Sequence, residues 1–217
     1  MDRRNAIKKR RQDQVREEIL DATRRVLLSR GLAGLTLDAV ARELDLTKAA
    51  LYHYYASKEA LVAELIYLSL ESHAKAVGAA VASATSGAGA IEALIRAAAD
   101  HYGTRKDELR LAYLVPQVGT AAATRFGPEM LARIRPFNEL MYGAAAQKIR
   151  QDQQAGRIAQ GIDGRRLAFV AHTSVLGMLT VEGLVETADE APLIHLRDAM
   201  VDELVSTFTA RLSAPES

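Results

Sequence analysis

Residues 36–61 read TLDAVARELDLTKAALYHYYASKEAL, and this stretch decides the fold of the N-terminal part of the chain. Thr36 precedes a short segment with apolar residues at helical spacing, so its hydroxyl can cap the free backbone N–H groups of a helix of about nine residues. Asp45-Leu46 ends that helix, and Thr47 can cap a second short helix that runs to about Tyr54. Helices this short are unstable alone, so they need longer neighbours.

The sequence supplies these neighbours on both sides. A helix is expected over about 13–30, with Gly31 as its stop, and a long helix from the capping residue Ser57 to about Ser83. Two short helices that are joined by a tight turn and held between longer ones form a helix-turn-helix unit. Its small core is expected to consist of Leu37, Val40, Leu44, Leu46 and Leu51.

About 50 residues, including the first helix, resemble the N-terminal domain of the TetR family of repressors. The residues that carry the resemblance are Thr36, Val40-Ala41, Leu46-Thr47, Leu51-Tyr52, Tyr54-Tyr55, Lys58-Glu59 and Leu61. Asp45 stands where the family usually has Gly in the turn, and Asp tolerates a left-handed backbone better than most residues. Ala49 replaces a frequent Gly near the start of the recognition helix, which bears on the operator that is preferred.

The resemblance implies that the third helix enters the major groove of DNA. Lys48, Ala50 and His53 are then the expected base readers. Thr36, Thr47, Tyr52 and Lys58 are the expected contacts to the phosphate backbone, which set register without reading sequence. A helical corner without a nucleic-acid role is the alternative.

Charge is distributed unevenly along the chain. The net charge is +1, but residues 1–60 hold 13 Lys and Arg against 9 Asp and Glu, and the remainder is acidic. The first eleven residues hold six bases and one acid. We expect residues 1–12 to form a basic flexible arm in which Arg10 and Arg11 contact DNA. Both insertion into the minor groove and a solvated tail are compatible with the sequence.

The composition predicts an all-α protein, because Ala and Leu dominate, aromatic residues make up 5% and only five prolines occur. The sequence shows neither an apolar run of membrane-spanning length nor a signal peptide, so a cytoplasmic protein is expected. It contains no cysteine, and His73, His101, His172 and His195 lack the spacing of metal ligands, so we expect neither metal nor cofactor. We found no phosphate loop or nucleophile elbow, so enzymatic activity is not expected.

Residues 13–56 are thus expected to form the DNA-binding domain and residues 57–217 a helical domain that binds an effector and forms a homodimer. The apolar faces of helices at about 164–186 and 192–212 are too extensive for one side of a monomer, and Ala171, Ser174 and Gly177 would permit close approach of a partner helix. A purely intramolecular core is the alternative.

Polar residues set among apolar ones mark a candidate effector pocket in this second domain. They are His101, Tyr102, Tyr113, Gln117, Asn138, Tyr142 and His172. A small-molecule effector that is partly hydrophobic and neutral or weakly anionic would fit them. The resemblance implies a repressor that such an effector releases from a palindromic operator. An activator, or a helical scaffold that has lost DNA binding, remains an alternative.

Overall fold

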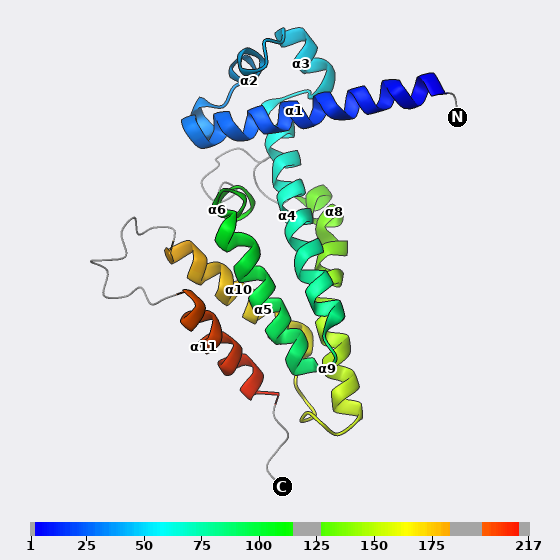
Figure 1. Cartoon of the computed structure of the whole chain (residues 1–217), viewed down its shortest axis with the longest axis vertical. Coiled ribbons are helices and arrows are strands. Elements are labelled where there is room, and N and C mark those ends of the chain that lie inside the picture. Colours follow the sequence, from blue (N-terminus) through cyan, green and yellow to red (C-terminus); the bar gives the residue numbers. More distant parts are fainter. Residues whose placement is uncertain (1–2, 115–126, 183–196, 213–217) are drawn as a thin grey trace, which may run out of the picture. The chain divides into compact units, whose positions relative to one another are not determined.

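The structure is a computed structural model, and it describes residues 3–114, 127–182 and 197–212. The described residues form helices and turns without a strand, which confirms the expected all-α class. The chain divides into two compact units (Figure 1): Met1–Leu68 with Arg110–Met130, and Ser69–Leu109 with Leu131–Ser217. None of the described helices is long and apolar enough to cross a membrane.

The first unit contains α1 (Arg3–Gly34), α2 (Leu37–Glu43), α3 (Lys48–Tyr54) and the start of α4 (Lys58–Ser83). Figure 1 shows α2 and α3 on the same side of α1. Helix α1 begins at Arg3, about ten residues earlier than expected, so the segment expected to be a flexible arm is helical. The reason is composition: residues 3–30 contain no Gly or Pro and are rich in Arg, Lys, Gln, Glu and Ala, which favour helix. Gly31, at φ 66°, interrupts α1 where a stop was expected.

Hydroxyl groups cap the short helices as predicted. Thr36 Oγ1 accepts a hydrogen bond from the Ala39 N–H at 3.0 Å, and Thr47 Oγ1 accepts one from the Ala50 N–H at 3.1 Å. Asp45 adopts a left-handed backbone with φ 53°. The tight turn between α2 and α3 therefore forms without the usual glycine.

The core of the first unit is made by apolar residues from all four helices. Of the five residues expected in the small core, Leu37, Val40 and Leu51 are buried, whereas Leu44 and Leu46 are half-buried. Burying one such side chain contributes roughly 1.5–3 kcal/mol. Helix α2, which is only seven residues long, thus depends on packing rather than on its own stability.

The second unit is built around α5 (Gly87–Thr104), which contacts α9 (Ala144–Gln154), α10 (Gly164–Glu182) and α11 (Arg197–Ala210). It also includes the C-terminal part of α4 and the short α6 (Lys106–Leu109). Ile91, Leu94, Ile95, Ile149 and Val175 are buried at its centre. The α10 start is capped as expected, since Asp163 Oδ1 accepts from the Arg166 N–H at 3.0 Å.

Two π-helical segments occur among the residues that the structure describes. The first, η1 (Arg110–Leu114), follows α6, and the second, η3 (Glu139–Gly143), lies between α8 (Pro128–Asn138) and α9. Pro136 lies inside α8, whose first residue is another proline, Pro128. The helical stretch expected from Pro136 to Gln154 is therefore present, but a π-helical turn widens it at η3.

Ionic contacts join the ends of helices in the second unit. Asp152, at the end of α9, accepts a hydrogen bond from the Gly87 N–H at 2.7 Å and also pairs with Arg157. These donors hold the pKa of Asp152 below its usual value. Glu182, near the end of α10, pairs with Arg197 of α11 and with Lys106 of α6. Helices α5 and α11 are thereby held to α9 and α10 by ionic contacts as well as by apolar packing.

Candidate functional site

The residues expected to read DNA bases lie on the outer surface of α3. Lys48 and His53 are exposed, and Ala50 is half-buried. The Lys48 ammonium group lies 3.1 Å from the Asp38 carboxylate of α2, and this hydrogen bond raises the pKa of Lys48. Lys48 therefore stays charged, and its position on α3 is steadied by a contact to the preceding helix.

The residues expected to contact phosphate groups surround the same surface. Thr36 and Thr47 are exposed at the starts of α2 and α3, Tyr52 is 48% exposed, and Lys58 is half-buried at the start of α4. All of these residues belong to the first unit. The exposure of these residues is compatible with the predicted contacts to DNA, and the contacts themselves stay predictions.

A groove of about 530 Å³ lies between the N-terminal half of α1 and the C-terminal end of α3. Lys8, Lys9 and Arg16 line it from α1, and His53 and Tyr54 line it from α3. The Arg16 guanidinium also lies 6.0 Å from the ring centre of Tyr55, which is within the range of a cation–π interaction. This groove was not predicted, because the expected helix started at residue 13.

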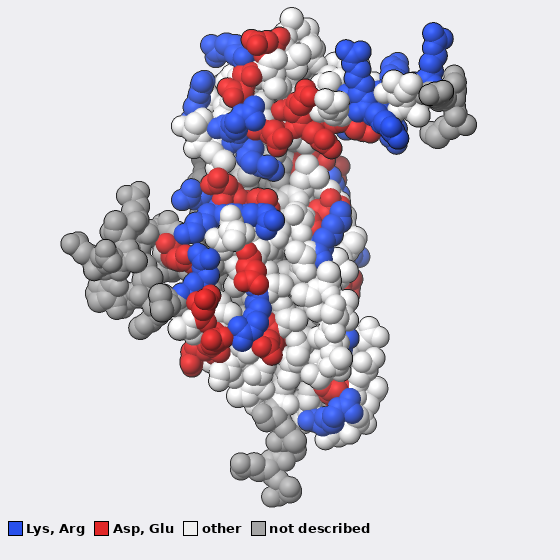
Figure 2. Space-filling model, viewed as in Figure 1, with Lys and Arg blue, Asp and Glu red and all other residues white. Residues whose placement is uncertain are grey.

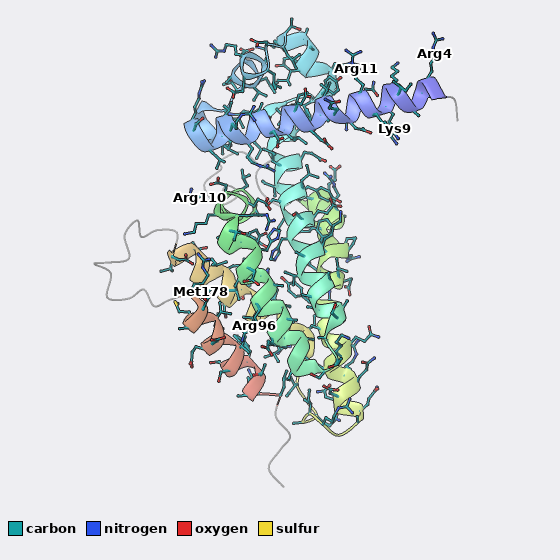
Figure 3. All side chains as sticks on the ribbon, viewed as in Figure 1. Arg4, Lys9, Arg11, Arg96, Arg110 and Met178 are labelled. Atoms are coloured by element: carbon teal, nitrogen blue, oxygen red, sulfur yellow. The ribbon has the colours of Figure 1, made fainter. Side chains whose placement is uncertain are left out.

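Basic side chains gather along this part of α1 (Figure 2). Arg4 and Arg11 project from the helix in Figure 3. Residues 4–14 are exposed throughout, so apolar burial within the chain does not account for them. The first turns of α1 therefore present their positive charges to the solvent.

A second constellation is buried in the other unit. The Tyr142 hydroxyl of η3 lies 2.7 Å from His172 Nδ1 of α10, and His172 Nε2 lies 2.8 Å from His73 Nε2 of α4. Both histidines are 1% exposed and Tyr142 is 7% exposed. Three elements that are distant in sequence therefore meet in one chain of hydrogen bonds, which we call the buried polar cluster.

Aromatic contacts surround this cluster. The His73 ring stacks on Tyr102 with centres 4.2 Å apart, and the His101 ring lies 5.2 Å from it at a steep angle. His101 Nε2 in turn lies 3.2 Å from the Glu108 carboxylate. The environment is apolar and aromatic with few polar atoms, as in a ligand pocket or in a specific polar core.

Burial keeps both histidines of the cluster neutral. Desolvation lowers the pKa of His172 to about 4 and that of His73 to about 2, and His73 is also affected by the nearby His172 and His101. In a neutral pair, one ring donates the shared hydrogen bond and the other accepts it. His73 Nδ1 is buried and has no hydrogen-bond partner among the described residues.

Four of the seven expected pocket residues, His101, Tyr102, Tyr142 and His172, lie in or beside the cluster. Tyr113 lies in η1 and Asn138 at the end of α8, both half-buried and outside the cluster, and Gln117 lies outside the described residues. His73 was considered only as a metal ligand. The sequence signal for its burial is that His73 lies on the same face of α4 as the buried residues Leu65, Ile66, Ser69, Ala74 and Val77.

The histidines also bear on metal binding. His73, His101 and His172 do come together, which their spacing in the sequence did not indicate. Across residues 3–114, 127–182 and 197–212, however, no group of three or more His, Asp or Glu residues is arranged to hold a metal ion. The short contact between His73 and His172 is instead a hydrogen bond.

The outer face of α10 is free of charge over several turns. Phe169, Val170 and Val181 are each about half exposed, and a Cβ atom added at Gly177 would meet no atom within 4 Å. Ala171, which was expected to face a partner helix, is instead buried inside the unit, because it lies on the side of α10 that faces the core. The expected dimer segments at 183–186 and 192–196 lie outside the described residues.

Comparisons with known proteins identify the first unit. Residues 19–65 match the sequence profile of bacterial regulatory proteins of the tetR family. A search among curated proteins finds no significant match. A regulatory protein of the tetR family from Rhodococcus RHA1 has a similar structure, with 15% identity, TM-score 0.69, and coverage of 93% of this chain and 98% of that chain.

Two further solved structures are similar over nearly their whole length. One is a protein of unknown function from Rhodococcus sp. RHA1, with 24% identity, TM-score 0.69, and coverage of 91% and 95%. The other is a TetR family transcription regulator from Marinobacter aquaeolei VT8, with 18% identity, TM-score 0.67, and coverage of 95% and 99%. These likenesses show a shared fold. The profile match is confined to residues 19–65, so it shows that the helix-turn-helix part of this chain is similar to bacterial regulatory proteins of the tetR family.

Proposed function

We propose that this protein is a homodimeric repressor that binds a palindromic operator through α3 and is released from it by a small effector. The observation that carries the proposal is the exposed surface of α3, with Lys48, Tyr52 and His53 held in place by capped helices and a tight turn. In helix-turn-helix proteins, residues near the start of the second helix contact base edges in the major groove. Residues 13–56 would then serve as the DNA-binding domain.

Selection of bound sequences from a random pool of duplex DNA, at near-physiological salt, tests DNA binding. The wild-type protein should enrich a palindrome. Tyr52→Ala should weaken binding to that sequence about fivefold, the effect of losing about 1 kcal/mol of hydrogen bonding. Leu131→Ala is the matched control, because Leu131 is exposed to the same extent, at 50% against 48%, in the other unit. A pool without enrichment would favour a helical scaffold that does not bind DNA.

The uncharged strip on α10 supports a homodimer. An exposed face of Phe, Val, Thr and Gly without charge is unusual on a monomer and fits a face that pairs with its copy across a twofold axis. By family resemblance, α10 and α11 would pair with their mates into a four-helix bundle. Such a dimer would match the twofold symmetry of a palindromic operator.

Light scattering coupled to size-exclusion chromatography tests this assembly. The wild-type protein should have twice the mass of the chain, and Gly177→Arg should have the mass of one chain, because it places a charge in the middle of the strip. Gln151→Arg, at an exposed position of α9, is the control and should leave the mass unchanged. A monomeric wild-type protein, or a dimeric Gly177→Arg variant, would contradict the proposed interface.

The buried polar cluster supports response to a ligand. His73 Nδ1, which is buried and has no hydrogen-bond partner among the described residues, can orient an uncharged or weakly anionic molecule, and the neighbouring aromatic rings can contact an apolar skeleton. His73 lies on α4, the helix that begins at Lys58 next to the helix-turn-helix. A ligand that favours another packing of His73 would therefore act on a helix whose first turns belong to the same unit as α3, and a coupling of about 1–3 kcal/mol would suffice for release.

A screen of uncharged ketones and alcohols for release of fluorescent operator DNA tests the response. An effector found in this way should release the wild-type protein, whereas His73→Gln should bind the operator normally and require a higher concentration for release. A compound that binds the purified protein in the second unit and leaves operator affinity unchanged would contradict the switch. Transcription in vitro with the operator at a promoter then separates repression from activation.

A further inference from the structure

The groove between α1 and α3 presents a combination of groups that suits one partner. Among the residues that line it, Lys8, Lys9 and Arg16 are basic and Asp13 is the one acid. Asn5 and Gln12 add amide groups from the same face of α1. Ammonium, guanidinium and amide donors in a row are the groups that bind phosphate oxygens of nucleic acids. The groove is therefore complementary to a polyanion of extended shape.

The neighbourhood of the groove indicates which part of DNA it meets. Its second wall is formed by His53 and Tyr54 at the end of α3, and Lys48, an expected base reader, lies at the other end of this seven-residue helix. Seven helical residues span about 10 Å. A strand that passes through the groove would thus lie next to the segment of DNA that α3 reads, and not on it.

The helical state of residues 3–12 restricts how this part of α1 can bind DNA. An α-helix with its side chains is about 10–12 Å wide, whereas the minor groove of B-DNA is about 6 Å wide. A flexible arm can enter that groove, but a formed helix cannot. The wider major groove of the segment that is read is filled by α3 in the proposed function, so contact with the sugar-phosphate backbone is the mode that fits this exposed basic helix.

We propose that the α1–α3 groove holds the backbone of one DNA strand beside the operator segment read by α3, with Lys8, Lys9 and Arg16 on its phosphates. His53 then contacts the backbone from the opposite wall and is not a base reader. This inference rests on the DNA binding proposed above. It adds a second contact region that strengthens binding without reading the sequence of the flanking base pairs.

The salt dependence of operator binding tests the inference. Each lysine that contacts a phosphate adds about 0.9 to the slope of log affinity against log salt concentration. The double variant Lys8→Gln/Lys9→Gln should therefore lower the slope by about 1.8 for each bound subunit. Between 50 and 200 mM salt, its affinity should fall about twelvefold less per subunit than that of the wild type. Gln favours helix about as well as Lys, so α1 remains formed.

The matched control removes the same charge from the other unit. Lys75→Gln/Lys148→Gln changes two lysines of α4 and α9 that lie outside the groove, and it should keep the wild-type slope. A second readout is the selected sequence. His53→Gln should weaken binding to all sequences alike, since a backbone contact carries no base preference.

Three results would overturn the inference. An unchanged slope in Lys8→Gln/Lys9→Gln, with intact operator binding, would show that the groove faces away from DNA. A loss that depends on whether the flanks are A·T or G·C would show minor-groove contact instead. A changed base preference at one position in His53→Gln would make His53 a base reader. If the wild-type protein enriches no sequence from the DNA pool, the proposed function itself fails, and the selection with the wild-type protein alone shows this.

Discussion

Removal of one hydroxyl group should measure how strongly the buried polar cluster stabilises the second unit. Tyr142→Phe deletes the oxygen that lies 2.7 Å from His172 Nδ1 and changes nothing else in the side chain. His172 is 1% exposed, so its Nδ1 would be left buried without this partner. An unsatisfied buried polar atom costs about 1–3 kcal/mol. In a chain of this size, that cost lowers the melting temperature by roughly 2–12 °C.

Thermal and urea unfolding followed by circular dichroism would give this difference. Tyr52→Phe is the control, because its hydroxyl belongs to a residue that is 48% exposed and its loss should change the free energy of unfolding by less than about 0.5 kcal/mol. If Tyr142→Phe unfolds like the wild type, the hydrogen bond to His172 contributes nothing and the cluster is not a specific polar core. A double-mutant cycle with His172→Leu should give a coupling of about 0.5–3 kcal/mol.

The remaining predictions concern protonation, the turn and the α5–α9 contact. Burial lowers the pKa of His172 to about 4 and that of His73 to about 2, so below about pH 6.5 the unfolded chain binds more protons than the folded chain does. The free energy of unfolding should therefore fall as the pH decreases below about 6.5, by up to about 1.4 kcal/mol per pH unit for each histidine. Urea titrations of the wild type and of His73→Gln check this, and equal pH slopes would contradict it. Asp45→Ala should lower the free energy of unfolding by about 1 kcal/mol, and Asp45→Gly should raise it slightly, because φ is 53° at this position. Asp152→Asn should lower the free energy of unfolding by about 2–3 kcal/mol, because the Gly87 N–H and Arg157 lose a charged acceptor. The control Asp202→Asn, at an exposed residue that pairs with Arg96, should change it by less than about 1 kcal/mol. Equal effects of the two variants would refute the role given to Asp152.

Features set by neighbouring residues could be predicted from the sequence. Thr36 and Thr47 cap the helices that follow them, and Asp45 makes the turn, because capping and turn conformation depend on a few consecutive residues. The predicted start of α1 was wrong, because the positive charge of residues 1–12 was taken as a sign of a flexible segment, although Arg and Lys favour helix. Spacing every four residues at Lys8, Gln12 and Arg16 would have indicated a helical face.

Features set by distant residues could not be predicted in this way. His73 and His172 are 99 residues apart, and their contact depends on how α4 and α10 pack in the second unit. Periodicity marks both helices as amphipathic, but it does not say which polar residue on a buried face meets which other. For the same reason Ala171 was assigned to the outer face of α10, although it lies in the core.

The discontinuous second unit has a consequence for the order of events during synthesis. Helix α5 contacts α9, α10 and α11, all of which follow it in the chain, and about a hundred residues separate its end from the end of α11. At translation rates of about 5–20 residues per second, α11, the last of these partners, is complete roughly 5–20 s after the apolar face around Ile91, Leu94 and Ile95. The helices of residues 3–68 have most of their partners within reach far earlier. A nascent chain stalled before α11 would therefore expose the part of the α5 surface that α11 covers in the complete chain.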